Sequence, residues 1–222
     1  MTLRSFIGMH INEYGYEKWI LVISLILLSL FFITKYLPMK TKHEKRSGGV
    51  LVAFIVALFT EMYGFPLTIY LLSSFFGIKI PFTHESGHLL GDLLTYLGIG
   101  NGWLIVMLIS TFLIIVGLGW IISGWREVYH SKGKLVTTGI YTKMRHPQYG
   151  GIFLITTAFL IQWPTIITVI MWPFLFGMYY GLAKKEEVAL EKRFKREYLK
   201  YKNKIPMFFP KLNIKKSIGI KK

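Results

Sequence analysis

Residues 149–182 read YGGIFLITTAFLIQWPTIITVIMWPFLFGMYYGL, an apolar run of 34 residues without a charged side chain. A helix that crosses a membrane needs about 20 residues, so this run is too long for one ordinary span. Gln162, Trp163 and Pro164 divide it near the middle, and a proline removes a backbone donor and restricts the residue before it. The run therefore predicts two short helices joined by a tight turn, a helical hairpin.

Three other apolar blocks precede this hairpin, at residues 19–37, 49–77 and 102–125. The chain has 222 residues and is 53% hydrophobic, more than a soluble domain of this size needs. We therefore expect an all-α integral membrane protein with five transmembrane helices, the last two forming the hairpin, plus a cytoplasmic C-terminal amphipathic helix. Residues 1–222 are expected to form a single membrane domain, divided into a three-helix part (1–125) and a C-terminal part (126–222).

The formal net charge of +16 is concentrated in three segments. Of the 27 Lys and Arg residues, five lie in 35–46, five in 126–145 and fourteen in 184–222, which share one side of a five-helix topology. The positive-inside rule then predicts an outside N-terminus, a cytoplasmic C-terminus and attraction to anionic lipids. No nucleic-acid-binding motif accompanies the charge, so we expect no such partner. The absence of cysteine excludes disulfides and thiolate chemistry.

Residues 84–88 match the H-E-x-x-H pattern of zinc hydrolases, in which two histidines bind the metal and a glutamate activates water. On a short helix beginning at His84, His88 and Asp92 would share its face. Three readings are open: an interfacial helix with polar residues toward water, a structural metal site, and a metal-dependent membrane hydrolase using His84, Glu85 and His88. The first is favoured because Gly87 and Gly91 weaken the helix, and no metal is expected.

Two polar segments flank the hairpin and carry the stronger functional signal. In the first, Tyr141, Arg145, His146 and Tyr149 fall within nine residues, and Pro147 begins the next helix. The second predicts an amphipathic helix, with an apolar stripe at 3.6 spacing and an ordinary i,i+4 pair of Glu191 and Lys195. The stripe consists of Leu190, Phe194, Tyr198 and Tyr201. An antiparallel hairpin would bring Glu186 and Glu187 close to Arg145 and His146.

These two segments together resemble a known family signature. The first block has the pattern G-x-Y-x-x-x-R-H-P-x-Y-x-G, formed by Gly139, Tyr141, Arg145, His146, Pro147, Tyr149 and Gly151. The second has the pattern E-E-x-x-L-x-x-x-F-x-x-x-Y-x-x-Y, which begins at Glu186. The pair resembles the isoprenylcysteine carboxyl methyltransferase family, within a wider group that includes membrane phospholipid methyltransferases. The resemblance covers about 85 residues of the C-terminal half, whereas the N-terminal half matches only in hydrophobicity and helix count.

The resemblance implies an S-adenosylmethionine-dependent methyltransferase that acts on a lipophilic or prenylated acceptor arriving from the bilayer. It places the cofactor at the cytoplasmic membrane face, and the residues expected to bind it are Tyr141, His146, Pro147, Tyr149, Gly151, Glu186 and Glu187. Arg145 is expected to hold an acceptor carboxylate or phosphate, and Glu187 to act as base for an amine acceptor. Oxygen, nitrogen and sulfur acceptors all stay open, as does the oligomeric state.

Two further expectations concern location and the N-terminal half. A multi-pass protein of a prokaryotic cytoplasmic membrane is expected. Glu61 is an ionisable residue inside an apolar block, which is costly and usually faces a cavity or a partner. It is expected either to line the acceptor pocket or to be hydrogen-bonded to a neighbouring helix, and a kink is expected at Gly64-Phe65-Pro66.

Overall fold

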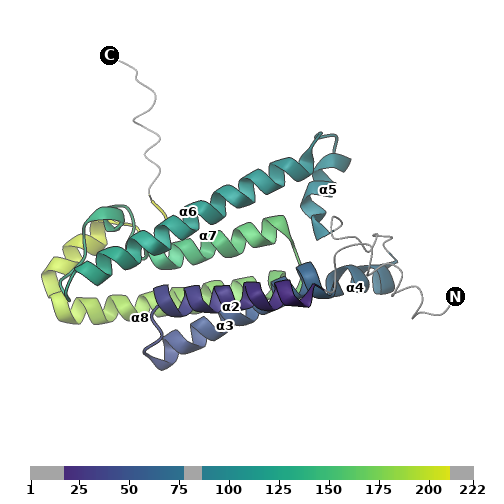
Figure 1. The fold of residues 1–222 in the computed structure, drawn as a ribbon. Helices are drawn as coiled ribbons and strands as arrows, with labels where there is room; N and C mark the ends of the chain where they lie inside the picture. The colour runs from purple at the N-terminus through teal and green to yellow at the C-terminus, as the bar shows by residue number, and fades with distance from the viewer. Residues whose placement is uncertain (1–17, 78–86, 211–222) are drawn as a thin grey trace, which may run out of the picture.

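The computed structural model describes residues 18–77 and 87–210, and every regular element in these ranges is helical. The elements in chain order are α2 (Trp19–Tyr36), α3 (Lys42–Phe59), the π-helical turn η1 (Thr60–Gly64), α4 (Leu67–Phe76), α5 (Leu89–Tyr96), α6 (Gly102–His130), the 3-10 turn η3 (Gly139–Thr142), α7 (Pro147–Gln162) and α8 (Ile166–Lys204). In Figure 1, α6 runs along α7, and α3 packs against both α2 and α8.

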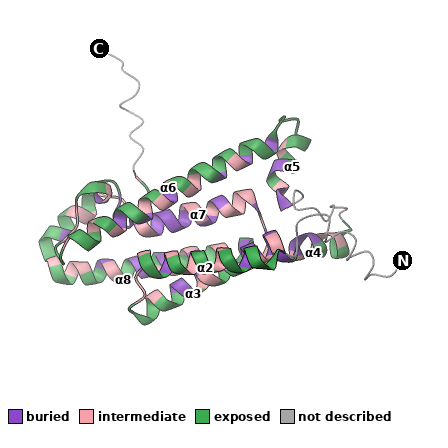
Figure 2. Ribbon diagram, viewed as in Figure 1, coloured by how far each residue is buried: buried purple, intermediate pink, exposed green. Residues whose placement is uncertain are grey.

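Among the residues that the structure describes, four helical stretches are long and apolar enough to cross a membrane: Trp19–Tyr36, Lys42–Gly64, Gly102–His130 and Ile166–Lys204. The chain is therefore an all-helical protein with several candidate membrane spans, as predicted. Figure 2 shows the outward faces of α2 and α6 as largely exposed, and these faces are rich in leucine, isoleucine and phenylalanine. The division predicted between residues 125 and 126 falls inside α6, which continues to His130.

The second apolar block does not form one helix, because α3 begins earlier and the block is broken inside. Thr41 caps α3: its side chain accepts from the Glu44 N–H, and the Glu44 side chain accepts from the Thr41 N–H. The π turn η1 ends at Gly64, and Pro66 is the N-cap of α4. The expected kink is thus a full interruption, because Pro66 cannot donate to a continuing helix.

Glu61 lies buried in the π turn, and its contacts favour the hydrogen-bonded alternative. Its Oε2 accepts from the Thr68 N–H at 2.9 Å, in the first turn of α4. The Thr68 hydroxyl oxygen accepts from the Ile166 N–H, also at 2.9 Å, at the start of α8. Glu61 therefore holds the first turn of α4, and Thr68 connects that turn to the start of α8.

The H-E-x-x-H segment lies partly outside the described residues, since His84 and Glu85 fall in the gap. The helix α5 begins at Leu89, so His88 precedes it as N-cap and does not share a helical face with Asp92. The buried His88 ring has its Nδ1 2.9 Å from the Gln162 carbonyl oxygen and lies edge-on to Trp163. Within 18–77 and 87–210, no three His, Cys, Asp or Glu side chains could hold a metal ion.

The predicted amphipathic helix is a continuation of α8 rather than a separate element. At 1.5 Å per residue, the 39 residues of α8 extend about 58 Å, well beyond a hydrocarbon core of about 30 Å. Its polar part, from Lys184 onward, follows the apolar part that is long enough to cross a membrane. A kink at Lys195 (φ 45°, ψ −118°) bends this part over the loop between α6 and α7. The bend replaces the predicted Glu191–Lys195 pair with one between Glu191 and Lys202, at 2.6 Å.

Candidate functional site

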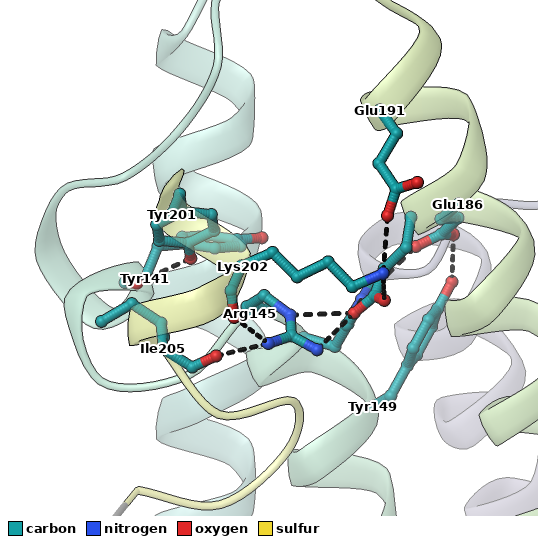
Figure 3. Close-up of polar contacts among 10 residues, drawn as sticks. Tyr141, Arg145, Tyr149, Glu186, Glu191, Tyr201, Lys202 and Ile205 are labelled. Carbon is teal, nitrogen blue, oxygen red and sulfur yellow. Dashed lines mark hydrogen bonds and ion pairs between the residues drawn. The ribbon is translucent and has the colours of Figure 1, made fainter. Parts of the chain in front are cut away.

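Arg145 is the centre of a polar cluster where the loop before α7 meets the polar part of α8. Its Nε donates to Glu187 Oε1 at 2.8 Å, and its Nη2 lies 2.7 Å from the same oxygen. Its Nη1 donates to the carbonyl oxygens of Lys202, at 2.8 Å, and Ile205 (Figure 3). Four of the five guanidinium N–H groups are thus occupied, and Arg145 ties the end of α8 to the loop.

Glu187 is fully buried, and three cationic side chains surround its carboxylate. Besides Arg145, Lys202 Nζ lies 3.0 Å from Oε2, and His146 Nε2 lies 3.4 Å from Oε1. A buried charge requires such compensation, because transferring one ion from water to the protein interior costs on the order of several kcal/mol. Lys202 also bridges to Glu191, so the cluster extends to the surface of α8 (Figure 3).

His146 lies between the two adjacent acids of α8. Its Nδ1 is 3.5 Å from Glu186 Oε2, and its ring is parallel to that of Tyr149, with 5.7 Å between centroids. Burial alone would lower the pKa of His146, but the carboxylates of Glu186 and Glu187 outweigh burial, and the pKa is raised above 6.5. The Tyr149 hydroxyl donates to Glu186 Oε1. Glu186 therefore has both an aromatic hydroxyl and an imidazole beside it.

The chain after α8 folds back over this loop as an extended strap, residues 205–208. The Arg145 N–H donates to the Pro206 carbonyl oxygen and the His146 N–H to that of Met207, both at 2.9 Å. Phe208 is buried against the His146 ring. The strap thereby fixes the backbone that carries the two central side chains of the cluster.

A cavity of about 720 Å³ opens beside this cluster. Of the residues predicted to form the site, Tyr141, Arg145, His146, Tyr149 and Glu186 line it. The apolar stripe predicted on the amphipathic helix lines it as well, so this helix packs over the cavity. Other walls come from the end of α2 and its connection to α3 (34–40), the end of α6, and residues 133–136.

Three of the predicted site residues lie near the cavity without lining it. Pro147 packs against Gly124 of α6, where an added Cβ would lie 2.9 Å from the proline ring. Gly151 faces α6 as well, and a Cβ there would lie 2.5 Å from the Gly117 carbonyl oxygen. The third is Glu187, which is enclosed by its cationic partners. Pro147 and Gly151 therefore lie where α6 and α7 pack closely together, and the glycines at these contacts permit the short distance.

Sequence reasoning did not find several residues that complete the site. Lys202 was treated only as surface charge, although it contacts Glu187, and the strap after α8 was not assigned any contact. The signal for the strap was Pro206, which cannot continue the preceding helix and is followed by two phenylalanines. Likewise, Pro38 ends α2 and turns the chain along the cavity.

Residues 101–192 match the family model described as isoprenylcysteine carboxyl methyltransferase (ICMT) family. Over this segment, the chain is similar to the ICMT family. The match runs from the start of α6 into the polar part of α8 and includes Arg145, His146, Glu186 and Glu187. A search of curated proteins finds no match to the chain. ICMT-family members are S-adenosylmethionine-dependent methyltransferases with lipophilic acceptors.

The cavity fits the cofactor of the ICMT family in size and in chemistry. Its volume falls within the range of about 300–1,000 Å³ that is typical of ligand sites. Tyr141 and Tyr149 offer aromatic faces to a sulfonium cation, and the Glu186 carboxylate offers a negative charge. Tyr198 also lines the cavity and is buried, and its hydroxyl has no hydrogen-bond partner within 18–77 and 87–210. Such a hydroxyl is costly unless a ligand completes it.

Proposed function

We propose that this chain is an ICMT-family enzyme that methylates a carboxylate oxygen of a lipophilic acid that reaches the cavity from the bilayer. The observation that carries this proposal is the charge of the cavity. Its lining contains five Lys and Arg side chains but one acidic side chain, Glu186. A site with this balance attracts an anionic head group and disfavours a cationic amine.

The cofactor-binding role is assigned to the side chains that converge on the cavity from the α7 loop and α8. Glu186 accepts from hydroxyl groups of the cofactor or faces its cation, and Tyr149 holds Glu186 in place through its hydroxyl. His146 carries a proton between the two acids, because its two ring nitrogens face Glu186 and Glu187, and it thereby holds Glu186 in place. Tyr198 supplies the unpartnered hydroxyl. These roles agree with the chemistry of each group in its observed surroundings.

When bound, the cofactor would supply a methyl group on a sulfonium. Transfer of this methyl group to a carboxylate oxygen would form a carbon–oxygen bond while the sulfur–carbon bond breaks. The products would be an ester and a neutral thioether, and no proton needs to be removed. The acceptor carboxylate is drawn by the cationic groups of Lys35, Lys40, Lys134 and Arg193, which lie around the cavity. Most of the rate enhancement then comes from holding the two reactants in line and from excluding water.

The surroundings of Glu187 also support an oxygen acceptor. An amine acceptor needs a base, and Glu187 is already bound to Arg145, His146 and Lys202 and does not line the cavity. We therefore assign Glu187 and Arg145 positioning roles: Glu187 aligns the guanidinium and the imidazole, and Arg145 holds the end of α8 over the loop. This assignment replaces the base and acceptor-binding roles expected from the sequence.

We further propose that α7 crosses the membrane as a fifth span, in a hairpin with α8. The 16 residues of α7 extend about 24 Å, and residues 163–165 reverse the chain before α8. The three basic segments then share one side with the cavity, which gives a cytoplasmic C-terminus, an outside N-terminus and contact with anionic lipids. The chain forms one membrane domain in a prokaryotic cytoplasmic membrane.

Calorimetry with S-adenosylhomocysteine on the full-length protein in detergent tests the cofactor site. We expect micromolar binding that falls about tenfold in Glu186→Gln, the loss of one charged hydrogen bond. Glu197→Gln is the matched control, because Glu197 is an exposed acid of α8 that does not line the cavity. Failure of the wild-type protein to bind would reject the cofactor assignment.

Methyl transfer from labelled S-adenosylmethionine to a matched set of acceptors tests the acceptor atom. The set consists of a long-chain thioether carboxylic acid and the primary amine that carries the same chain. Label is expected on the acid only, as an ester that alkali hydrolyses with release of labelled methanol. Alkali-stable label on the amine would contradict the oxygen-acceptor proposal.

A further inference from the structure

The cavity reaches the gap between α2 and α6, two helices that are candidate membrane spans. Its lining includes Thr34 and Tyr36 from the last turn of α2, and Trp125 and Val128 near the end of α6. The polar lining comes from the α7 loop and α8, so the cavity has a polar end and a partly apolar end. The apolar end is the one that lies between the two spans.

One aromatic pair joins the two helices at this place. The rings of Tyr36 and Trp125 meet edge to face, with centroids 5.5 Å apart and planes at 76°. Both side chains are only partly buried, and Trp125 also stacks on the exposed Tyr129. The Tyr36 carbonyl oxygen accepts from Gln148 Nε2 at 3.3 Å, which connects this pair to the first turn of α7.

The connection that follows Tyr36 is held firmly, so the aromatic pair lies on a fixed frame. Met39 packs on α3, where a Cβ added to Gly48 would meet its sulfur at 2.5 Å. The capping box of Thr41 and Glu44 fixes the next turn. An opening between α2 and α6 therefore requires rotation of the two aromatic side chains rather than movement of this connection.

On the side of the pair that faces the apolar parts of α2 and α6, the surface is apolar and exposed, whereas the exposed Lys35 and Arg126 lie next to the pair in sequence. Phe31 on α2 is 61% exposed, and Ile122 on α6 is 42% exposed. In a bilayer these faces contact lipid chains, so a hydrocarbon chain can pass between the two helices without leaving an apolar environment. The cationic groups around the cavity then receive its acidic head group.

We propose that Tyr36 and Trp125 form a lateral gate between α2 and α6, which admits the hydrocarbon tail of the acceptor and limits the width of the tail that can be accepted. This inference rests on the proposed function and adds the route and the residues that select the acceptor. Tyrosine and tryptophan are also common anchors at membrane interfaces. If these two side chains only anchored the helices at the interface, the rate of methyl transfer to the acceptor would not change when the gap between the helices is closed. The gate predicts that this rate falls.

A reversible bridge across the gap tests the gate. The chain has no cysteine, so Thr34→Cys with Val128→Cys provides the sole thiol pair, on opposite sides of the gap. A bifunctional thiol reagent that forms cleavable disulfides is applied to the full-length protein in nanodiscs. Bridging is expected to lower methyl transfer to a long-chain thioether acid about tenfold, with cofactor-product affinity unchanged and with recovery after reduction. The two single-cysteine variants, treated with the same reagent, are the matched controls.

Turnover in the bridged protein equal to that of the single variants would overturn the gate, as would a parallel loss of S-adenosylhomocysteine affinity.

A second measurement does not depend on turnover: a long-chain thioether acid with a diazirine on its tail is photolysed in the presence of S-adenosylhomocysteine. Labelling is expected on peptides that contain Tyr36 or Trp125, and less in the bridged protein. Labelling elsewhere, or none, rejects the gate. Failure of the proposed function shows separately, as absent binding of S-adenosylhomocysteine to the wild-type protein.

Discussion

Glu187→Gln is expected to destabilise the protein strongly, because this substitution removes the anion that three cationic groups share. Glu187 has no exposed surface, and Arg145, Lys202 and His146 lie within 3.4 Å of its carboxylate. Breaking a buried ion pair by removing one partner costs about 3–5 kcal/mol. Lys202 is 28% exposed and water can reach one side of the cluster, so we take the lower limit of about 3 kcal/mol. For a chain of this size, that corresponds to a fall in melting temperature of about 6–12 °C.

Differential scanning fluorimetry in one detergent, at one scan rate, measures this shift. Glu191→Gln is the matched control: Glu191 also contacts Lys202, at 2.6 Å, but its side chain is 31% exposed. An exposed pair contributes about 0–1 kcal/mol, so the control is expected to shift by about 4 °C or less. Equal shifts in the two variants would refute the reasoning that burial makes Glu187 the anchor of the cluster.

Three further predictions follow from the site. The pKa of His146 is raised above 6.5 in the folded state, so the protonated imidazole stabilises this state. This contribution is fully present below pH 6.5 and is lost as the pH rises through the folded-state pKa. The difference in melting temperature between wild type and His146→Gln should therefore be largest in acid and shrink toward alkaline pH; a pH-independent difference contradicts this. Tyr198→Phe should leave thermal stability unchanged or slightly raised, yet weaken S-adenosylhomocysteine binding about five- to tenfold in calorimetry; unchanged affinity removes Tyr198 from the site. Gly151→Ala should lower the free energy of unfolding by about 1–3 kcal/mol, because the added methyl group overpacks against α6. Gly177→Ala is the control: this glycine lies in open space on α8, so the substitution should be neutral or stabilising in the same thermal scan. Similar shifts for both would contradict close packing of α6 and α7.

The hydrophobic runs, together with the prolines and glycines that interrupt them, were enough to predict the helical class and most helix boundaries. Residues 19–37 appear as α2 with an end that differs by one residue, because Pro38 stops the helix where the apolar run stops. The apolar run at 102–125 gave the start of α6 correctly but not its end, since Arg126 and Glu127 continue the helix outside the run. The block at 49–77 was expected to be one helix with a kink at Gly64-Phe65-Pro66; the helix is interrupted there, and hydropathy does not reveal the π turn around Glu61 that precedes the break.

Sequence spacing also predicted that Arg145 and His146 would lie near Glu186 and Glu187, and the contacts among these four side chains agree with it. It did not predict how these groups divide their contacts. The role of Glu187 depends on Lys202, which approaches only because α8 bends at Lys195. The enclosure of Arg145 depends on the strap after α8, and neither feature leaves a periodic pattern in the sequence.

The sequence by itself determined that the chain is helical and apolar enough to enter a membrane, and it placed acids, tyrosines and an imidazole in the two polar segments around residues 141–149 and 186–201. These properties follow from local composition and from the repeat of the helix, which neighbouring residues encode. Only the tertiary structure decided which of these groups face the cavity and which neutralise one another. That choice depends on approach distances of a few ångströms between distant segments, where the free energy of a buried charge depends on all of its partners at once.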